Sequence, residues 1–315
     1  MNILVTGGTG FIGTQLVDEL LREGHSVRLI GRRQRTDLKP TWRDEVDYVQ
    51  ANFFGETNFE ACTKGIDVVY HLLWTSLPRS SPEFSVHYLE ANVGYSLRLL
   101  DACVANKVKK VVFTSSGGTV YGITDHYPIK EEAALQPITN YGITKVTFEQ
   151  YLALYHYQYG IDYAVARIAN AYGEHQNPFK KQGVVAAWLY SIINEEPIEV
   201  WGDGSVVRDY LYNQDLTEAL IKMAATGLPE KVFNVGSGVG LSLNQVLDTL
   251  RKVTDATPEV RYLRQHKDDV PFNILEIQRL SDTLDWQPRT SFEQGIRFMY
   301  DAFKTRYARS TNDLS

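Results

Sequence analysis

Continuous apolar runs alternate with helix-patterned stretches along the first half of this chain. The runs lack the polar–apolar alternation of a half-exposed strand, so they indicate strands buried on both faces of a parallel sheet. They lie at Asn2–Thr6, 26–30, 46–50, 67–72, 109–114 and 161–168. Between them, apolar residues recur at helical spacing over Phe11–Arg22, 84–106 and 141–159. Because strands that alternate with helices form right-handed βαβ crossovers, the pattern predicts an α/β fold with a doubly wound parallel sheet.

The pattern becomes more mixed after about residue 170. A polar stretch at 173–183 predicts a loop, and a polar tail at 310–315 is expected to fray. The remaining predicted elements are helices at 184–194, 214–225 and 243–253, strands at Ile198–Trp201 and Val232–Val235, and a glycine turn at 202–204. We therefore predict a first domain over residues 1–169 and a smaller mixed α/β lobe over 170–315, with some later segments returning to the first sheet.

Composition narrows the classes of protein that fit this fold. The chain has 315 residues, of which 43% are apolar, enough to bury a sizeable core. A net charge of −6 lacks the basic footprint of a nucleic-acid binder, and no run approaches the roughly 18 apolar residues of a membrane helix. Cys62 and Cys103 form no paired motif, and the N-terminus does not read as a secretory signal, so we expect a reducing, cytoplasmic location. The seven histidines are scattered, so no metal site is expected.

A glycine-rich turn links the first predicted strand to the first predicted helix. It reads Gly7-Gly8-Thr9-Gly10-Phe11-Ile12-Gly13, which matches G-x-G-x-x-G from Gly8 and G-x-x-G-x-x-G from Gly7. Glycines permit the tight turn, and the helix N-terminus offers free N–H groups to a pyrophosphate. The turn and its context predict a dinucleotide-binding, or Rossmann, domain.

The end of the second strand bears on which dinucleotide binds. In an NAD site an acidic residue there holds the ribose hydroxyls. Here the strand ends with Ile30-Gly31-Arg32-Arg33, and the first acid downstream is Asp37. Arg32 and Arg33 could grip a 2′-phosphate with paired N–H donors, which favours NADP over NAD. A solvated basic turn is the alternative, so NAD and NADP both remain open.

A tyrosine and a lysine stand four residues apart at the start of the helix-patterned stretch 141–159. That spacing puts Tyr141 and Lys145 on one helix face. A free phenol has a pKa near 10, which is too high for a base at neutral pH, and a neighbouring ammonium lowers it. The pair follows a strand that ends in Ser115-Ser116, at the carboxyl side of the sheet where such folds bind ligands.

Four motifs occur in a recognisable order. They are Gly7–Gly13, Ser115–Gly122 (SSGGTVYG), Tyr141–Lys145, and Gly202–Tyr210 followed by Asp215. Together they resemble the extended short-chain dehydrogenase/reductases, in the branch of NAD(P)-dependent nucleotide-sugar epimerases and dehydratases. The resemblance spans nearly the whole chain. It implies a nucleotide-sugar substrate, and among its members the 4-epimerases of UDP-hexoses are most similar.

The resemblance also implies roles for single residues. Tyr141 would be the general base and Lys145 would hold both it and the cofactor ribose. Ser116, 25 residues before Tyr141, would be the hydroxyl partner, with Ser115 as the alternative because the double glycine leaves the register open. Asn92 would brace the active site. Further implied cofactor contacts are Gly7, Gly10, Phe11, Ile12, Gly13, Asn52, Phe53 and Leu72, and further implied substrate contacts are Asn170, Arg208, His266 and Asp269.

Three departures from the family pattern bear on the substrate. His266 stands where a diphosphate-binding arginine is usual, with Arg264 as the nearest substitute, and Trp74 replaces a small residue near the cofactor. Gly117 and Gly118 stand where dehydratases carry Asp-Glu, which argues against 4,6-dehydration.

Three functions fit these motifs. The chain is expected to be a UDP-hexose 4-epimerase that oxidises C4 transiently and returns the hydride. The alternatives are an NADPH-dependent reductase of a nucleotide-linked 4-keto-6-deoxy sugar, which Arg32 and Arg33 motivate, and a non-catalytic NADP-binding sensor. The resemblance also implies a homodimer formed by the helices at 84–106 and 141–159.

Overall fold

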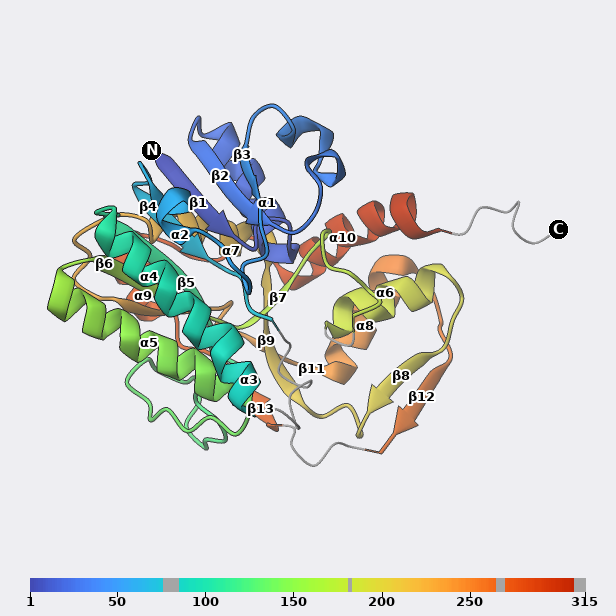
Figure 1. Cartoon of the computed structure of the whole chain (residues 1–315). Coiled ribbons are helices and arrows are strands. Elements are labelled where there is room, and N and C mark those ends of the chain that lie inside the picture. The colour runs from blue at the N-terminus through green and yellow to red at the C-terminus, as the bar shows by residue number, and fades with distance from the viewer. Residues whose placement is uncertain (76–84, 181–182, 265–269, 309–315) are drawn as a thin grey trace.

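A seven-stranded parallel sheet forms the centre of the molecule (Figure 1). The computed structural model describes residues 1–75, 85–180, 183–264 and 270–308. The spatial order of the sheet is β3 (Asp47–Gln50), β2 (Ser26–Gly31), β1 (Asn2–Thr6), β4 (Val68–His71), β5 (Lys110–Ser116), β6 (Asp162–Ile168) and β10 (Val232–Val235). The direction of winding reverses between β1 and β4, and ligands of such sheets bind at the carboxyl ends of the strands around this point.

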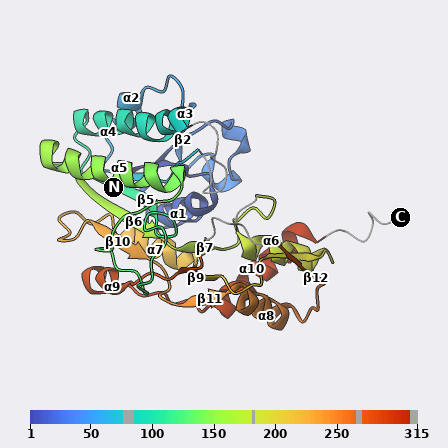
Figure 2. The same ribbon diagram turned by 90° about the horizontal axis from the view of Figure 1, so that it is seen from below.

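Helices cover both faces of this sheet (Figure 2). Helices α2 (Phe59–Thr63), α4 (Tyr95–Ala105) and α5 (Asn140–Tyr159) bury one face, with Phe113 and Phe148 in its core. The other face packs on α1 (Phe11–Arg22), α7 (Asn213–Lys222) and α9 (Gln278–Leu284). The fully buried Ile3, Leu4 and Val5 show why the strands read as continuous apolar runs, since both sheet faces are covered.

The second lobe is built around β9 (Val207–Tyr212). This strand pairs with β7 (Asn170–Tyr172), β11 (Gly240–Ser242) and β13 (Phe272–Asn273), while β8 (Ile198–Trp201) pairs with β12 (Val260–Leu263). Its helices α6 (Val184–Ile193), α8 (Leu243–Thr254) and α10 (Phe292–Tyr307) share one apolar core with these strands. Among the described helices, none is long and apolar enough to cross a membrane.

The predicted α/β fold is confirmed, and β10 shows that a late segment does return to the first sheet. The division at residue 169 stays a prediction. Short helical turns at Arg35–Asp37 and Pro40–Trp42 precede β3. The predicted helix at 84–106 is interrupted, because α3 (Ser85–Leu89) continues through a π-helical turn (Glu90–Gly94) into α4. This extra-wide turn carries Asn92, and such bulges are frequent at functional sites.

Candidate active site

The turn between β1 and α1 has the geometry of a phosphate cradle. Gly7 has a φ of +75°, a backbone conformation that favours glycine. A Cβ added at Gly7 would lie 3.0 Å from Leu73 N, so the turn passes close to the chain that follows β4. At Gly13 an added Cβ would lie 2.3 Å from the carbonyl oxygen of Gly7. Gly10 precedes α1 and no side chain caps the helix there. The backbone N–H groups of this helix end, beside the half-buried Phe11 and Ile12, are therefore left for a ligand such as a pyrophosphate.

The carboxyl end of β2 presents two exposed arginines. Tyr48 packs under this end and donates a hydrogen bond of 2.8 Å to the carbonyl oxygen of Arg33. Within the described part of the chain, no ion pair or hydrogen bond engages the guanidinium groups of Arg32 and Arg33, and both side chains are exposed. Arg35 differs, since it donates to the carbonyl oxygens of Arg43 and Val46. The first two arginines are thus available to an anionic ligand, whereas the third is structural.

Two further cofactor candidates follow β3. Asn52 is exposed, and its side-chain oxygen accepts a hydrogen bond from Phe54 N at 3.3 Å. Phe53 is buried and stacks on His71, with ring centroids 5.5 Å apart. Phe53 therefore packs in the core, and Asn52 is the side chain of this pair that a ligand could reach. Leu72, directly after β4, lies half-buried against the Gly7 turn.

Tyr141 and Lys145 lie in the first two turns of α5. Thr139 caps this helix by accepting a hydrogen bond from Gly142 N at 3.1 Å. Lys145 is buried and donates to the carbonyl oxygen of Thr114 at 2.6 Å, near the end of β5. Its ammonium nitrogen lies 5.5 Å from the centroid of the Tyr141 ring. The structure thus brings the predicted tyrosine and lysine to the carboxyl end of the sheet.

The two serines at the end of β5 have different surroundings. The hydroxyl of Ser115 is buried and donates to a carboxylate oxygen of Glu149 on α5. Ser116 is the last residue of the strand and is half-buried, and its hydroxyl makes no hydrogen bond to any residue that the structure describes. Adjacent strand residues point to opposite faces. Ser115 is therefore engaged inside the protein, whereas Ser116 keeps its hydroxyl for a ligand.

Burial shifts the pKa of both members of the tyrosine–lysine pair. It raises the pKa of Tyr141, and it lowers the pKa of Lys145 well below its usual value. Desolvation, with a contribution from the Lys145 charge, also lowers the pKa of His71 to about 3. Desolvation is the largest cause of both shifts, because it disfavours the phenolate of Tyr141 and the ammonium of Lys145.

Neutral His71 and the amide of Asn92 brace the chain around the site. The His71 ring lies between Thr6 and Ser96, with nitrogen–oxygen distances of 2.7 and 2.8 Å. Asn92 accepts a hydrogen bond from Thr75 N at 2.8 Å and donates to Tyr88 O at 2.9 Å. These bonds tie the segment after β4 to the π-helical turn.

The predicted substrate residues fall into two groups. Asn170 begins β7 opposite Tyr210, and its buried side-chain NH₂ group has no hydrogen-bond partner among the described residues. Arg208 lies half-buried on β9, next to β13. His266 and Asp269 lie outside the described residues, and Arg264 is exposed after β12. The unpartnered amide of Asn170 fits a contact to a polar ligand, because buried polar groups are otherwise satisfied.

The sequence did not point to Asn273. Asn273 is buried on β13 opposite Arg208, and its amide donates to the carbonyl oxygen of Gly117 at 3.0 Å. Its side-chain oxygen has no partner among the described residues, and neither has the hydroxyl of Thr119. These atoms lie on the segments around Ser116. The only sequence signal for Asn273 was its position two residues after Pro271.

Known proteins resemble this chain in sequence and in fold. Residues 3–236 match the model of the NAD dependent epimerase/dehydratase family. UDP-glucose 4-epimerase of Thermotoga maritima, solved with UDP-glucose, has a TM-score of 0.89 at 32% identity, over 97% of this chain and 99% of that one. UDP-glucose 4-epimerase of Thermus thermophilus, solved with NAD, has a TM-score of 0.88 at 29% identity, over 97% and 100%.

A relative with a different reaction has comparable similarity. The dTDP-4-dehydro-6-deoxyglucose reductase of Escherichia coli is 29% identical over 300 residues, which cover 93% of this chain and 95% of that protein. Overall similarity at this level does not separate epimerisation from reduction, so the choice between them depends on the site itself.

Proposed function

Because this chain belongs to the NAD-dependent epimerase/dehydratase family, we propose that it is a UDP-hexose 4-epimerase that oxidises C4 of the sugar and returns the hydride to the opposite face. The observation that carries the proposal is the position of Tyr141 and buried Lys145 beside the end of β5, with an unengaged hydroxyl on Ser116. A base, a cation and a hydroxyl at one strand end are the groups that removal of a proton from an alcohol requires.

The residues of the glycine turn fit a dinucleotide. Only glycine fits at position 13, because a Cβ there would press on the backbone of Gly7. The start of α1 has no side-chain cap, so its free N–H groups suit a pyrophosphate. Gly7, Gly10, Phe11, Ile12 and Gly13 would hold the dinucleotide, together with Asn52 and Leu72, whereas the buried side chain of Phe53 packs in the core. When bound, the nicotinamide supplies the hydride chemistry.

In the proposed mechanism, Tyr141 removes the proton from the C4 hydroxyl and later returns it. Ser116 orients that hydroxyl through its own, and Lys145 stabilises the phenolate and binds the ribose. Since burial raises the pKa of Tyr141, we expect the phenolate to form only when ligands add positive charge and complete the site. Asn170 and Arg208 would bind the nucleotide part, with His266 and Asp269 as further contacts.

A second candidate is reduction of a nucleotide-linked 4-keto-6-deoxy sugar with NADPH. The exposed, unengaged guanidinium groups of Arg32 and Arg33 favour it, because they suit a 2′-phosphate. Purified protein that releases NAD on denaturation and interconverts UDP-glucose and UDP-galactose supports the epimerase. Protein that arrives empty, fails to interconvert these sugars and consumes NADPH with a keto-sugar would replace the epimerase with the reductase.

A non-catalytic NADP sensor is tested by Tyr141→Phe. Turnover is expected to fall by about a thousandfold, in the range that acid–base groups contribute, with dinucleotide binding retained. Tyr155→Phe on the same helix is the matched control, since Tyr155 bonds to Asp101 instead. A sensor would show no difference between the two variants and no turnover in either.

A further inference from the structure

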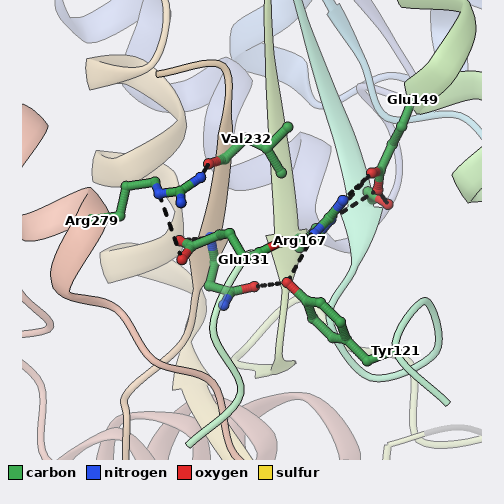
Figure 3. A network of polar contacts seen from close by, with 8 residues as sticks. Tyr121, Glu131, Glu149, Arg167, Val232 and Arg279 are labelled. Atoms are coloured by element: carbon green, nitrogen blue, oxygen red, sulfur yellow. Dashed lines mark hydrogen bonds and ion pairs between the residues drawn. The ribbon is translucent and has the colours of Figure 1, made fainter. Parts of the chain in front are cut away.

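A continuous network of buried polar groups runs through the end of the central sheet (Figure 3). At its centre Arg167 on β6 donates to the carboxylate of Glu149 on α5, with nitrogen–oxygen distances of 2.7 and 3.1 Å. Glu149 also accepts the hydroxyl of Ser115. Arg167 donates further to the Tyr121 hydroxyl and to the carbonyl oxygen of Glu131, both at 3.0 Å.

The network continues from Tyr121 to the molecular surface. The Tyr121 hydroxyl donates to Asn234 on β10 at 2.7 Å, and Asn234 N donates to the carboxylate of Glu131 at 2.8 Å. Glu131 then faces Arg279 at 3.7 Å, and Arg279 is the member nearest to solvent (Figure 3). The Tyr121 hydroxyl, the Asn234 amide and each guanidinium nitrogen of Arg167 thus have protein partners.

Glu149 and Ser115, at the buried end of this network, are close in sequence to the side chains of the proposed site, Tyr141, Lys145 and Ser116. Glu149 follows Lys145 by four residues on α5, as Lys145 follows Tyr141, so the three share one helix face. Ser115 precedes Ser116 directly. The segment that bears Tyr121 begins with a turn in which Val120 N donates to Ser116 O at 3.1 Å. The network thus fixes the helix, the strand end and the turn relative to one another.

Stability alone is a weak explanation for the Glu149–Arg167 pair. Only 3% of the Glu149 side chain and 5% of the Arg167 side chain are exposed. Desolvation largely cancels the attraction of so buried a pair, and apolar replacements are often as stable. Strand β6 carries a second pair at its opposite end, where Asp162 at its start lies 3.3 Å from the buried ammonium of Lys110 at the start of β5. That pair is remote from the site and gives a comparison within one molecule.

Glu149 is also the charged partner of Lys145. Four other charged or titratable groups surround the pair. On α5, Tyr141 and Glu149 lie one turn to either side of Lys145, and the neutral His71 acts on it from β4. Arg167 on β6 lies beyond Glu149, and Tyr88 on α3 acts on Tyr141. Desolvation lowers the pKa of Lys145, and the negative charge of Glu149 opposes that effect.

We propose that Glu149, clamped by Arg167 and Ser115, is a positioning residue for the reaction proposed above: its carboxylate holds the end of β5 against α5 and places a negative charge one helical turn from Lys145. This inference rests on the proposed function. Glu149 bonds to neither Tyr141 nor Ser116 and acts through Lys145 and Ser115.

The experiment compares Glu149→Gln with Asp162→Asn in the full chain. In Glu149→Gln we expect kcat for C4 epimerisation to fall by about tenfold or more, with KM for the sugar and the Kd for dinucleotide changed much less. Because Lys145 loses its stabilising charge, the alkaline limb of the kcat–pH profile moves to lower pH. Asp162→Asn should lower the melting temperature to a similar degree and leave kcat and the profile as in the wild type. Glu149→Asp, which keeps the charge, should restore the profile in part.

The proposal is overturned if Glu149→Gln matches Asp162→Asn in kcat and in pH profile at equal loss of stability. If Glu149→Gln does not fold, Ser115→Ala and Tyr121→Phe each remove one contact from the network and should lower kcat without raising KM. Wild-type kcat in both of these variants would also overturn it.

A second measurement separates this inference from the proposed function. The ¹³Cε signal of Lys145, assigned by its loss in Lys145→Met, reports the charge of that lysine without any turnover. Its titration midpoint should move to lower pH in Glu149→Gln and not in Asp162→Asn. If wild-type protein shows no epimerisation, the proposed function fails, whatever the titration shows. If the Lys145 midpoint in Glu149→Gln equals that of the wild type, the effect of Glu149 on Lys145 is overturned, whatever the activity.

Discussion

At the scale of single residues, the surroundings of Lys145 decide whether it can carry charge. Its ammonium nitrogen lies 4.0 Å from the centroid of the Trp74 ring and 4.6 Å from that of Phe113. Aromatic faces attract cations by about 2 kcal/mol when both are desolvated. Trp74 packs against Phe113 and Phe148 in the core beneath Lys145. Trp74 therefore packs in the core and places its ring against the ammonium of Lys145.

We expect Trp74→Leu to make activity more sensitive to alkali. Removing the ring lowers the pKa of Lys145 further, because the charged form loses its partner. Activity that needs a charged Lys145 is lost as the pH rises through this pKa, so the alkaline limb should move to lower pH. Trp74→Phe, which keeps a weaker ring face, should fall between the two in a series of kcat–pH profiles. An identical profile for all three proteins would show that the contact has no electrostatic role.

The arginines after β2 allow a test of cofactor choice. Replacing Arg32 and Arg33 together by alanine should weaken NADP binding by roughly 10- to 100-fold, since hydrogen bonds to charged groups contribute about 1.5–3 kcal/mol. NAD binding should be unchanged. Arg22→Ala, another exposed arginine, is the control, and fluorescence titration with both dinucleotides is the measurement. Equal loss for NAD and NADP would remove the basis for NADP preference.

At the scale of elements, the sequence predicted best where burial is complete. The strands of the central sheet were found because a run covered on both faces leaves a continuous apolar signature, as in Ile3 to Val5. β9 was missed because Val207–Tyr212 mixes Arg208 and Asp209 with aromatic residues. Asp209 is fully buried, and its carboxylate accepts from Ser237 N at 2.7 Å and Leu275 N at 3.3 Å. Such partners are distant in sequence, so local patterning could not reveal them.

The glycine turn is an element whose geometry tolerates no side chain at Gly13, where an added Cβ would lie 2.3 Å from the carbonyl oxygen of Gly7. In Gly13→Ala the new Cβ would press on the carbonyl oxygen of Gly7, so we expect dinucleotide binding to be lost while far-UV circular dichroism changes little. Gly94→Ala is the control, because a Cβ there meets nothing within 4 Å and alanine favours a helix. Retained dinucleotide affinity in Gly13→Ala would mean that the ligand binds elsewhere.

At the scale of the whole molecule, the candidate site is assembled from both halves of the chain. The glycine turn, Tyr141 and Lys145 were predictable because each carries a local motif. The contact of Asn273 with Gly117 and that of Tyr121 with Asn234 were not, because they join segments more than a hundred residues apart. The sequence favoured Ser116 and left Ser115 as the alternative, and the bond between Ser115 and Glu149, which joins residues 34 positions apart, could not be read from it.

Exposed apolar side chains on α3 and α5 support the expected homodimer. Leu89, Ile143 and Leu154 are 46%, 46% and 42% exposed. Helix α3, which bears Leu89, continues into α4, and α5, which bears Ile143 and Leu154, lies beside them (Figure 1). Ile143→Glu with Leu154→Glu should convert a dimer to a monomer in analytical ultracentrifugation. Tyr262→Glu, at an exposed position in the other lobe, should leave the mass unchanged. A wild-type protein that sediments as a monomer would refute the dimer.

The place of β10 at the end of the central sheet has a consequence for synthesis of the chain. β6 pairs on one side with β5, and its other edge is covered only when Val232–Val235 arrives. A nascent chain that has just released Ile168 from the ribosome therefore exposes a flat, apolar strand edge, which is a template for pairing with other chains. A stop codon between these two strands would leave a fragment that aggregates or stays bound to chaperones, although it contains the glycine turn, Tyr141 and Lys145.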